Sequence, residues 1–272
     1  IGTFDRGGTT GAATSIDANG RVFTPGYKSP RFYHQYDSAS GLWTPRGPLL
    51  EGSRKHVCLQ SEDWSTTWAA VGTPTRVAAS DTAAGVSLDT IGDDDGAVLE
   101  GYTQTATFTG NAVKAVSIHV KKGTSTSSAI RLRDTTAGAD RLLAIITWSG
   151  SVPSIAMTTG TLIGSTRLTG DVYRILLATT SVTAANTNSL QFYPATDAAL
   201  ATANTGTIIA GGVDAEDGAF PSSYTKVTTV AITRSADAFS FALNAPPQAM
   251  TLYAKYVDLG SRIGAPTAGG QV

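Results

Sequence analysis

The side chains that most often perform catalysis are scarce in this sequence. It contains three histidines, His34, His56 and His119, and a single cysteine, Cys58. None of the histidines lies in an HExxH pattern, and neither a GxSxG elbow nor a GxxxxGK loop is present. Cys58 stands between two apolar residues, which favours a buried small hydrophobic side chain over a nucleophile. We therefore expect a protein that is not an enzyme.

The densest group of carboxylates is Asp93, Asp94 and Asp95, which a glycine bounds on each side. Adjacent carboxylates in such a turn can offer oxygen ligands to Ca²⁺, which takes about six to eight of them. The spacing falls short of an EF-hand loop. Two interpretations stay open, a structural Ca²⁺ site and a solvated turn between strands, and the short spacing favours the turn.

Aromatic side chains that could stack on a sugar ring form the third group. The candidates are Trp148, Tyr102 and Tyr193, with Trp43 nearer the N-terminus. Aromatic residues also fill β-sandwich cores and anchor interfaces. For Trp148, at the end of an apolar run, the core is the favoured interpretation. A glycan site at these residues would act by stacking and hydrogen bonding.

Composition limits the partners that these groups could serve. The chain has 272 residues in 28.0 kDa, with 20 Lys and Arg against 21 Asp and Glu and a formal net charge of −1. This balance gives no general electrostatic attraction to nucleic acid or to an anionic membrane, and no apolar run approaches the roughly 18 residues of a membrane span. We expect neither partner, and we expect any glycan contact to be weak and insensitive to salt.

The segments that must position these residues are predicted to be strands. Apolar and polar residues alternate over 116–120 and 130–133, so one face of each strand is expected to be buried and the other wet, with His119 on the wet face. Further strands are expected at 75–79, 85–91, 97–108, 141–148, 172–180, 189–193, 206–213 and 226–233. The pattern predicts an all-β fold, an antiparallel two-sheet jelly-roll sandwich preceded by an extended, loop-rich N-terminal segment.

The chain divides into three parts by composition. Residues 1–55 are rich in Gly and Pro turns and are expected to form an extended anchoring leader, held through the aromatic residues Phe23, Phe32, Tyr33, Tyr36 and Trp43. Residues 56–243 carry the strand pattern and are expected to form the sandwich, pinned at its start by Trp64 and Trp68 and closed by a turn with Phe220 buried. Residues 244–272 begin with a Pro pair and are expected to be a linker and the first strand of a further, incomplete domain.

Several stretches, in order, resemble tailed-bacteriophage virion proteins with a carbohydrate-binding-module-like jelly roll. They are Ser15 to Gly20, Pro30-Arg31-Phe32, Gly47 to Arg54, Ser61 to Trp64, Asp171 to Arg174, Asp214 to Tyr224 and Thr233 to Asp237. The resemblance covers roughly residues 14–240. It implies a virion location and a fibre-, spike- or tail-type structural protein. Folds of this type often carry a structural Ca²⁺.

Three functions follow from these observations. The leading one is a phage virion structural protein whose module contacts host-surface polysaccharide. The second is a purely architectural capsid or tail decoration or cement protein, and the third is a polysaccharide-binding module of a secreted bacterial enzyme. A leader that buries too little to fold alone favours the first two. We expect the partners to be other virion subunits and the protein to be a homo-oligomer, a trimer being the usual symmetry of phage fibres.

Overall fold

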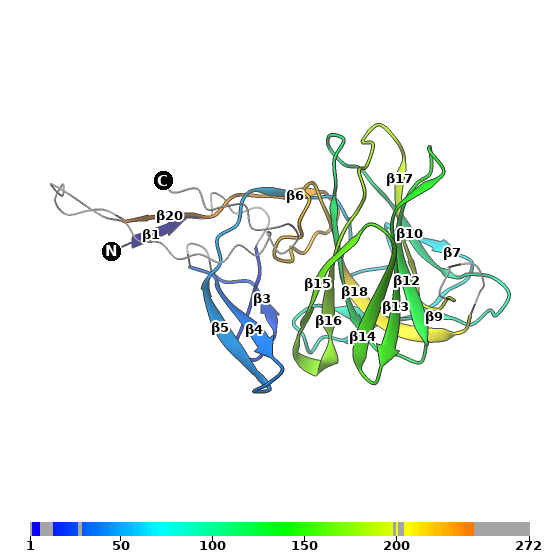
Figure 1. Cartoon of the computed structure of the whole chain (residues 1–272), viewed down its shortest axis with the longest axis horizontal. Helices are drawn as coiled ribbons and strands as arrows, with labels where there is room; N and C mark the ends of the chain where they lie inside the picture. Colours follow the sequence, from blue (N-terminus) through cyan, green and yellow to red (C-terminus); the bar gives the residue numbers. More distant parts are fainter. Residues whose placement is uncertain (1, 6–12, 27–28, 198–199, 201–203, 242–272) are drawn as a thin grey trace.

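The structure is a computed structural model, and it describes residues 2–5, 13–26, 29–197, 200 and 204–241. Its body is a two-sheet sandwich, and the leader packs beside it (Figure 1). Strand β1 (Gly2–Asp5) pairs with β20 (Ala238–Phe241) at the end of the molecule away from the sandwich (Figure 1). Within the described ranges, no helix has the length and apolar character that crossing a bilayer requires. The segment 244–272, which we predicted to open another domain, lies outside the described residues.

One sheet has six strands in the order β14-β13-β12-β17-β10-β7. All of its pairings are antiparallel. Its strands are β7 (Ala69–Val71), β10 (Gly101–Ala106), β12 (Ser127–Asp134), β13 (Ala139–Ser149), β14 (Val152–Thr159) and β17 (Asn188–Tyr193).

The other sheet has eight strands, ordered β15-β16-β11-β18-β6-β19, with β9 also on β18 and β8 on β9. Its strands are β6 (Arg54–His56), β8 (Thr75–Asp81), β9 (Leu88–Asp93), β11 (Ala115–Lys121), β15 (Thr161–Arg167), β16 (Tyr173–Ala178), β18 (Gly206–Glu216) and β19 (Ile232–Arg234). The chain passes from one sheet to the other between β10 and β11, β11 and β12, β16 and β17, and β17 and β18, as in a jelly roll. The predicted all-β antiparallel sandwich is confirmed.

The main core lies between the two sheets, where alternate residues of each strand point inward. Trp64 and Trp68 enter it as predicted, and the ring of Trp64 lies 4.5 Å from that of Trp68 and 5.3 Å from that of Phe192 between centroids. Cys58 is a free, fully buried thiol in the same core, as expected. Burial raises the pKa of that thiol well above its usual value, which keeps it unreactive.

Three of the sequence predictions about the sandwich are wrong. The strand expected at 226–233 is reduced to β19, because residues 224–228 instead form a loop that covers the eight-stranded sheet and bonds to Ser61. Phe220, expected to be buried, is 37% exposed. The expectation that one face of β11 is exposed to solvent is also wrong, since Ser117 and His119 are both buried.

His119 illustrates how that outer face is covered. Its ring lies edge-on to Tyr224, at 5.0 Å between centroids, and its Nδ1 is 3.0 Å from the Gly212 carbonyl oxygen. Burial, with the nearby Arg174 guanidinium, lowers the pKa of His119 to about 3. The ring is therefore a neutral packing element and not a surface base.

The leader contains more regular structure than its turn-rich sequence indicates. It forms two hairpins, β2 (Ser15–Ile16) with β3 (Val22–Phe23), and β4 (Phe32–Asp37) with β5 (Leu42–Pro48). Of the aromatic residues expected to anchor it, Trp43 packs on Tyr36 and against Gly20. Phe23 and Phe32 are instead 39% and 52% exposed.

A buried group of charges joins the leader to the residues that close the sandwich. We call Arg31, Glu51, Arg234 and Asp237 the leader clamp. Arg31 donates to Glu51 at 2.8 Å and also to Asp237, and its side chain is fully buried. Buried charges are tolerated only when they are paired, so these four side chains depend on one another.

Candidate functional site

The best candidate site lies on the outer face of the six-stranded sheet. We call it the outer-face cluster, and its members are Arg131, Arg133, Asp140, Gln191 and Tyr193. Arg131 and Arg133 alternate with core residues of β12, so both side chains leave the opposite face. In the sheet register Arg131 is opposite Gln191, and Arg133 pairs with Asp140 across the bulge of the β12–β13 hairpin.

The cluster is held together by charge-assisted hydrogen bonds. Arg131 Nε donates to Asp140 Oδ1 at 2.6 Å, and Arg133 Nη1 donates to the same oxygen at 3.0 Å. These side chains are partly open to solvent, with 19%, 33% and 22% exposed for Arg131, Arg133 and Asp140. Because one carboxylate fixes two guanidinium groups, their positions are set before a ligand arrives.

Tyr193 forms the buried side of this cluster. Its hydroxyl is 3.4 Å from Gln191 Oε1, and burial raises the pKa of the phenol while Arg131 opposes that rise. Its ring packs with Ala129, Leu143 and Ile145 on the outer face. Leu99 and Leu200 lie over this apolar end. The polar end at Arg133 and Asp140 is therefore the side by which a ligand can approach.

This arrangement suits a polar ligand with several hydroxyl groups. Guanidinium, amide and hydroxyl groups offer donors, and Asp140 and Gln191 offer acceptors. An apolar wall beside them provides the contact that sugar rings use. No member has the nucleophile and base pairing that covalent catalysis requires.

The three aromatic residues proposed for a glycan site do not come together. Tyr102 lies on the inner face of the same sheet, where its ring is 5.6 Å from that of Trp64. Trp148, at the end of β13, packs against the main core. Only Tyr193 is on the outer face. Tyr102 is directly opposite Phe192 in the register, which places Tyr193, one residue on, on the other side of the sheet.

The acidic run also separates into different environments. Asp93 is buried, and its two oxygens accept the backbone N–H groups of Asp95 and Glu100. Asp94 and Asp95 are exposed. Burial raises the pKa of Asp93, with the backbone hydrogen bonds opposing the rise. The geometry is that of a hydrogen-bonded turn, and Ca²⁺ binding there stays a prediction.

The described residues bring together one group of the type that ligates metals, His56, Asp214 and Glu216, with ligand atoms within 4.8 Å of one another. All three are buried. His56 Nδ1 is 2.9 Å from Asp214, and Glu216 accepts the Ser222 N–H at 2.9 Å. The carboxylates thus already have partners, and the geometry supports an internal ion pair.

The pKa directions in this group agree with that assignment. Burial alone would lower the pKa of His56, but the Asp214 carboxylate raises it above its usual value. Burial, together with Asp214, raises the pKa of Glu216 to about 7. The group therefore favours a protonated His56 beside the Asp214 carboxyl group, and Glu216 keeps its proton to near-neutral pH.

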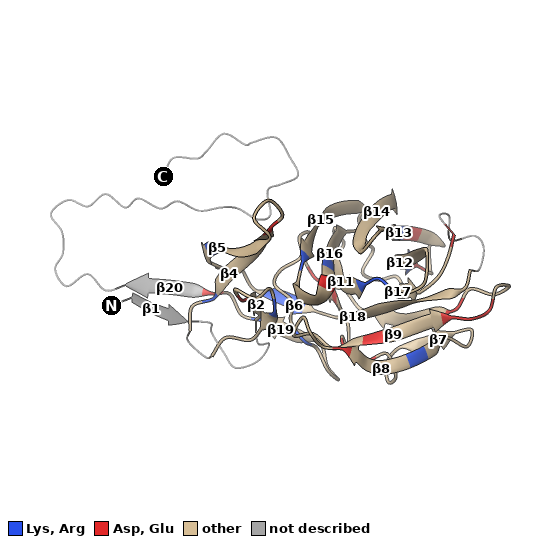
Figure 2. Cartoon of the chain, turned by 90° about the horizontal axis from the view of Figure 1, so that it is seen from below, with Lys and Arg blue, Asp and Glu red and all other residues tan. Residues whose placement is uncertain are grey.

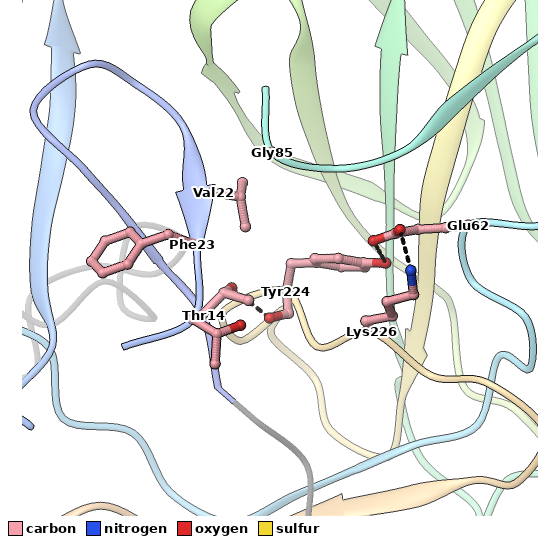
Figure 3. Close-up of a pocket in the computed structure, with 8 residues that line it drawn as sticks. Thr14, Val22, Phe23, Glu62, Gly85, Tyr224 and Lys226 are labelled. Carbon is pink, nitrogen blue, oxygen red and sulfur yellow. Dashed lines mark hydrogen bonds and ion pairs between the residues drawn. The ribbon is translucent and has the colours of Figure 1, made fainter. Parts of the chain in front are cut away.

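A small pocket of about 180 Å³ lies between the leader and the sandwich. In it Tyr224 donates to Glu62 at 2.9 Å and Lys226 pairs with Glu62 at 2.7 Å, while the ring of Phe23 points away from both (Figure 3). Thr14 closes the other side through a hydrogen bond to the Tyr224 carbonyl oxygen. Since its polar groups already bind one another, this pocket serves to anchor the leader.

Sequence reasoning did not single out Arg131, Arg133, Asp140 or Gln191. Arg131 and Arg133 were recognised only as the polar residues of an alternating strand. The signal that would have found them is the two-residue spacing of the arginines, followed by an aspartate just after the turn of the same hairpin.

Comparison with known proteins adds little to this description. No family model matches the chain, and no curated protein matches it in sequence. Among solved structures, the chain is similar to an arabinose-bound GH51 α-L-arabinofuranosidase, with 11% identity over 78% of this chain and a TM-score of 0.36. The chain spans 30% of the length of that protein. At this level the likeness carries no argument about function.

Proposed function

We propose that this chain is a structural protein of a tailed-phage virion, a fibre, spike or tail component that contacts host-surface glycans through the outer-face cluster. The observation that carries the glycan part is the set of polar groups preorganised around Asp140 beside the apolar end of the outer sheet face. The virion part rests on the sequence resemblance. Cofractionation with assembled particles would support it, and isolation with a secreted enzyme would contradict it.

The position of the leader supports display of this face. The Val22 N–H donates to the Ala84 carbonyl oxygen, and the Thr169 N–H donates to the Gly20 carbonyl oxygen. Both contacts are made to loops that join strands of the eight-stranded sheet. These contacts of the leader therefore do not cover the polar end of the outer-face cluster, while β1 and β20 pair at the far end of the molecule (Figure 1).

Retention on host cell-envelope polysaccharide tests the glycan contact. Tyr193→Phe and Gln191→Ala each remove one hydrogen-bonding group from the cluster, and we expect weaker retention from both. Ser154→Ala is the matched control, because Ser154 is an exposed residue of β14 outside the cluster. Undetectable retention of the unaltered protein, measured as an oligomer, would discard the glycan contact.

A second candidate function is purely architectural, and the surface of the leader favours it. Phe32, Leu42 and Leu50 are 52%, 64% and 54% exposed, and an interface formed by the leader would bury these apolar side chains. In this case the leader packs on another virion subunit or on a copy of itself, with a trimer as the expected assembly. Light scattering at micromolar concentration tests this, and a monomer would contradict the oligomer.

A further inference from the structure

The charges in the outer-face cluster do not balance. It holds two guanidinium groups and one carboxylate, and both guanidinium groups donate to a single oxygen, Asp140 Oδ1. The charged side chains that act on the Tyr193 hydroxyl are the same three, Arg131, Asp140 and Arg133. The cluster therefore carries a local charge of +1 although the chain as a whole carries −1.

This local excess is not visible in the charge distribution of the whole molecule. Figure 2 shows Lys and Arg interspersed with Asp and Glu along the strands. Two other arginines of the sandwich are neutralised more completely. Arg141 pairs with Asp134, and Arg76 bonds to both Asp89 and Asp63. Arg131 and Arg133 must share one partner, which leaves guanidinium N–H groups available to another acceptor.

We infer that the ligand of this face is an acidic saccharide, one whose sugar carries a carboxylate. This inference rests on the proposed function and names the class of glycan. A guanidinium group binds a carboxylate through two parallel hydrogen bonds, a geometry that a neutral hydroxyl cannot reproduce. Gln191 and Tyr193 then remain for the ring hydroxyls. Binding is correspondingly sensitive to salt, in contrast to the salt-insensitive contact expected from the net charge alone.

The test compares two probes that differ only in charge. Polygalacturonate and its methyl ester share a backbone, so the full chain is measured against both by affinity electrophoresis. We expect the acidic polymer to bind roughly tenfold or more tightly, a difference that shrinks as salt is added. Because this comparison uses the unaltered protein, it does not depend on the folding of any variant.

Two variants assign the effect to the cluster. Arg133→Gln and Arg131→Gln should each lower binding of polygalacturonate roughly tenfold, and lower binding of the methyl ester by a smaller factor. Arg46→Gln is the matched control, since Arg46 is an exposed arginine of the leader hairpin. A thermal melt of each variant shows whether it is folded.

The outcomes separate this inference from the proposed function. Equal binding of both polymers, abolished by Tyr193→Phe, would overturn the acidic ligand and leave a glycan site at this face. Preference for the acidic polymer that persists in both arginine variants would also overturn it. Binding of neither polymer, together with no retention on host polysaccharide, would overturn both proposals.

Discussion

Arg31 Nη2 donates a hydrogen bond to Asp237, a residue 206 positions further along the chain, and both side chains are buried. The two residues belong to the leader and to the segment that closes the sandwich. Asp237 Oδ2 also accepts the Glu51 N–H at 2.8 Å. Together with the contacts of Val22 and Gly20, this pair therefore makes the leader a part of the folded unit and not an appendage.

Removal of the Arg31 side chain should be strongly destabilising. Arg31→Ala leaves the buried Asp237 and the largely buried Glu51 without the cation that hydrogen-bonds to both, and breaking a buried pair from one side costs about 3–5 kcal/mol. Arg46→Ala, at an exposed position of β5, should change the free energy of unfolding by less than about 0.5 kcal/mol. Urea unfolding measures both. Equal, small effects would show that the clamp adds nothing to stability.

The close approach of the leader to the sandwich should depend on Gly85. Its φ is +79°, and a Cβ atom there would lie 2.1 Å from the Val22 carbonyl oxygen. Gly85→Ala should therefore displace β3 and open the exposed bond after Arg21 to trypsin. Gly110 has a φ of +70° but no heavy atom within 4 Å of such a Cβ. Gly110→Ala should cost only about 1 kcal/mol and leave the leader protected.

Tyr102 should behave as a core residue and not as a ligand contact. Tyr102→Ala removes a ring that packs on Trp64, and truncation of a buried aromatic residue costs about 3–5 kcal/mol. Thr105→Ala, at an exposed position of the same strand, is the control. A Tyr102→Ala protein of unchanged stability that has lost glycan retention would contradict the assignment.

Glu216 should make stability fall as pH rises towards neutrality. Its pKa is raised from 4.5 to about 7, so the folded chain keeps a proton that the unfolded chain has already released. The free energy of unfolding contributed by this residue is complete below about pH 4.5 and is lost as pH rises through 7. Glu216→Gln removes the ionisation and keeps an acceptor for the Ser222 N–H.

The measurement is the melting temperature of both proteins between pH 5 and 8. We expect the melting temperature of the variant to increase relative to that of the unaltered protein as pH rises. Parallel pH profiles would mean that Glu216 ionises as it does in water.

Local patterns predicted many of the sandwich strands but not what packs on them. The alternation at 116–120 correctly predicted β11, yet Ser117 and His119 are buried because Arg174 and Tyr224 cover them from distant parts of the chain. The alternation of apolar and polar residues describes one strand at a time. It cannot indicate which distant segments pack on the polar face of that strand.

The outer-face cluster could not be predicted from the sequence for a similar reason. The polar face of β12 was recognised, but its charge balance depends on the register of the β12–β13 hairpin, which brings Asp140 to both arginines. A one-residue change in that register would place Asp140 on the other face. Tyr193 was recognised from its residue type alone, and so were Tyr102 and Trp148, which lie elsewhere.

The leader clamp also has a consequence for biosynthesis. Arg31 leaves the ribosome long before Arg234 and Asp237 are translated, so its guanidinium group stays hydrated until the closing segment emerges. The sandwich strands in between can begin to pair during translation, whereas completion of the leader clamp must wait for the segment that holds Arg234 and Asp237. Until then the apolar side chains of residues 22–50 are open to chaperones or to neighbouring nascent chains on the same message.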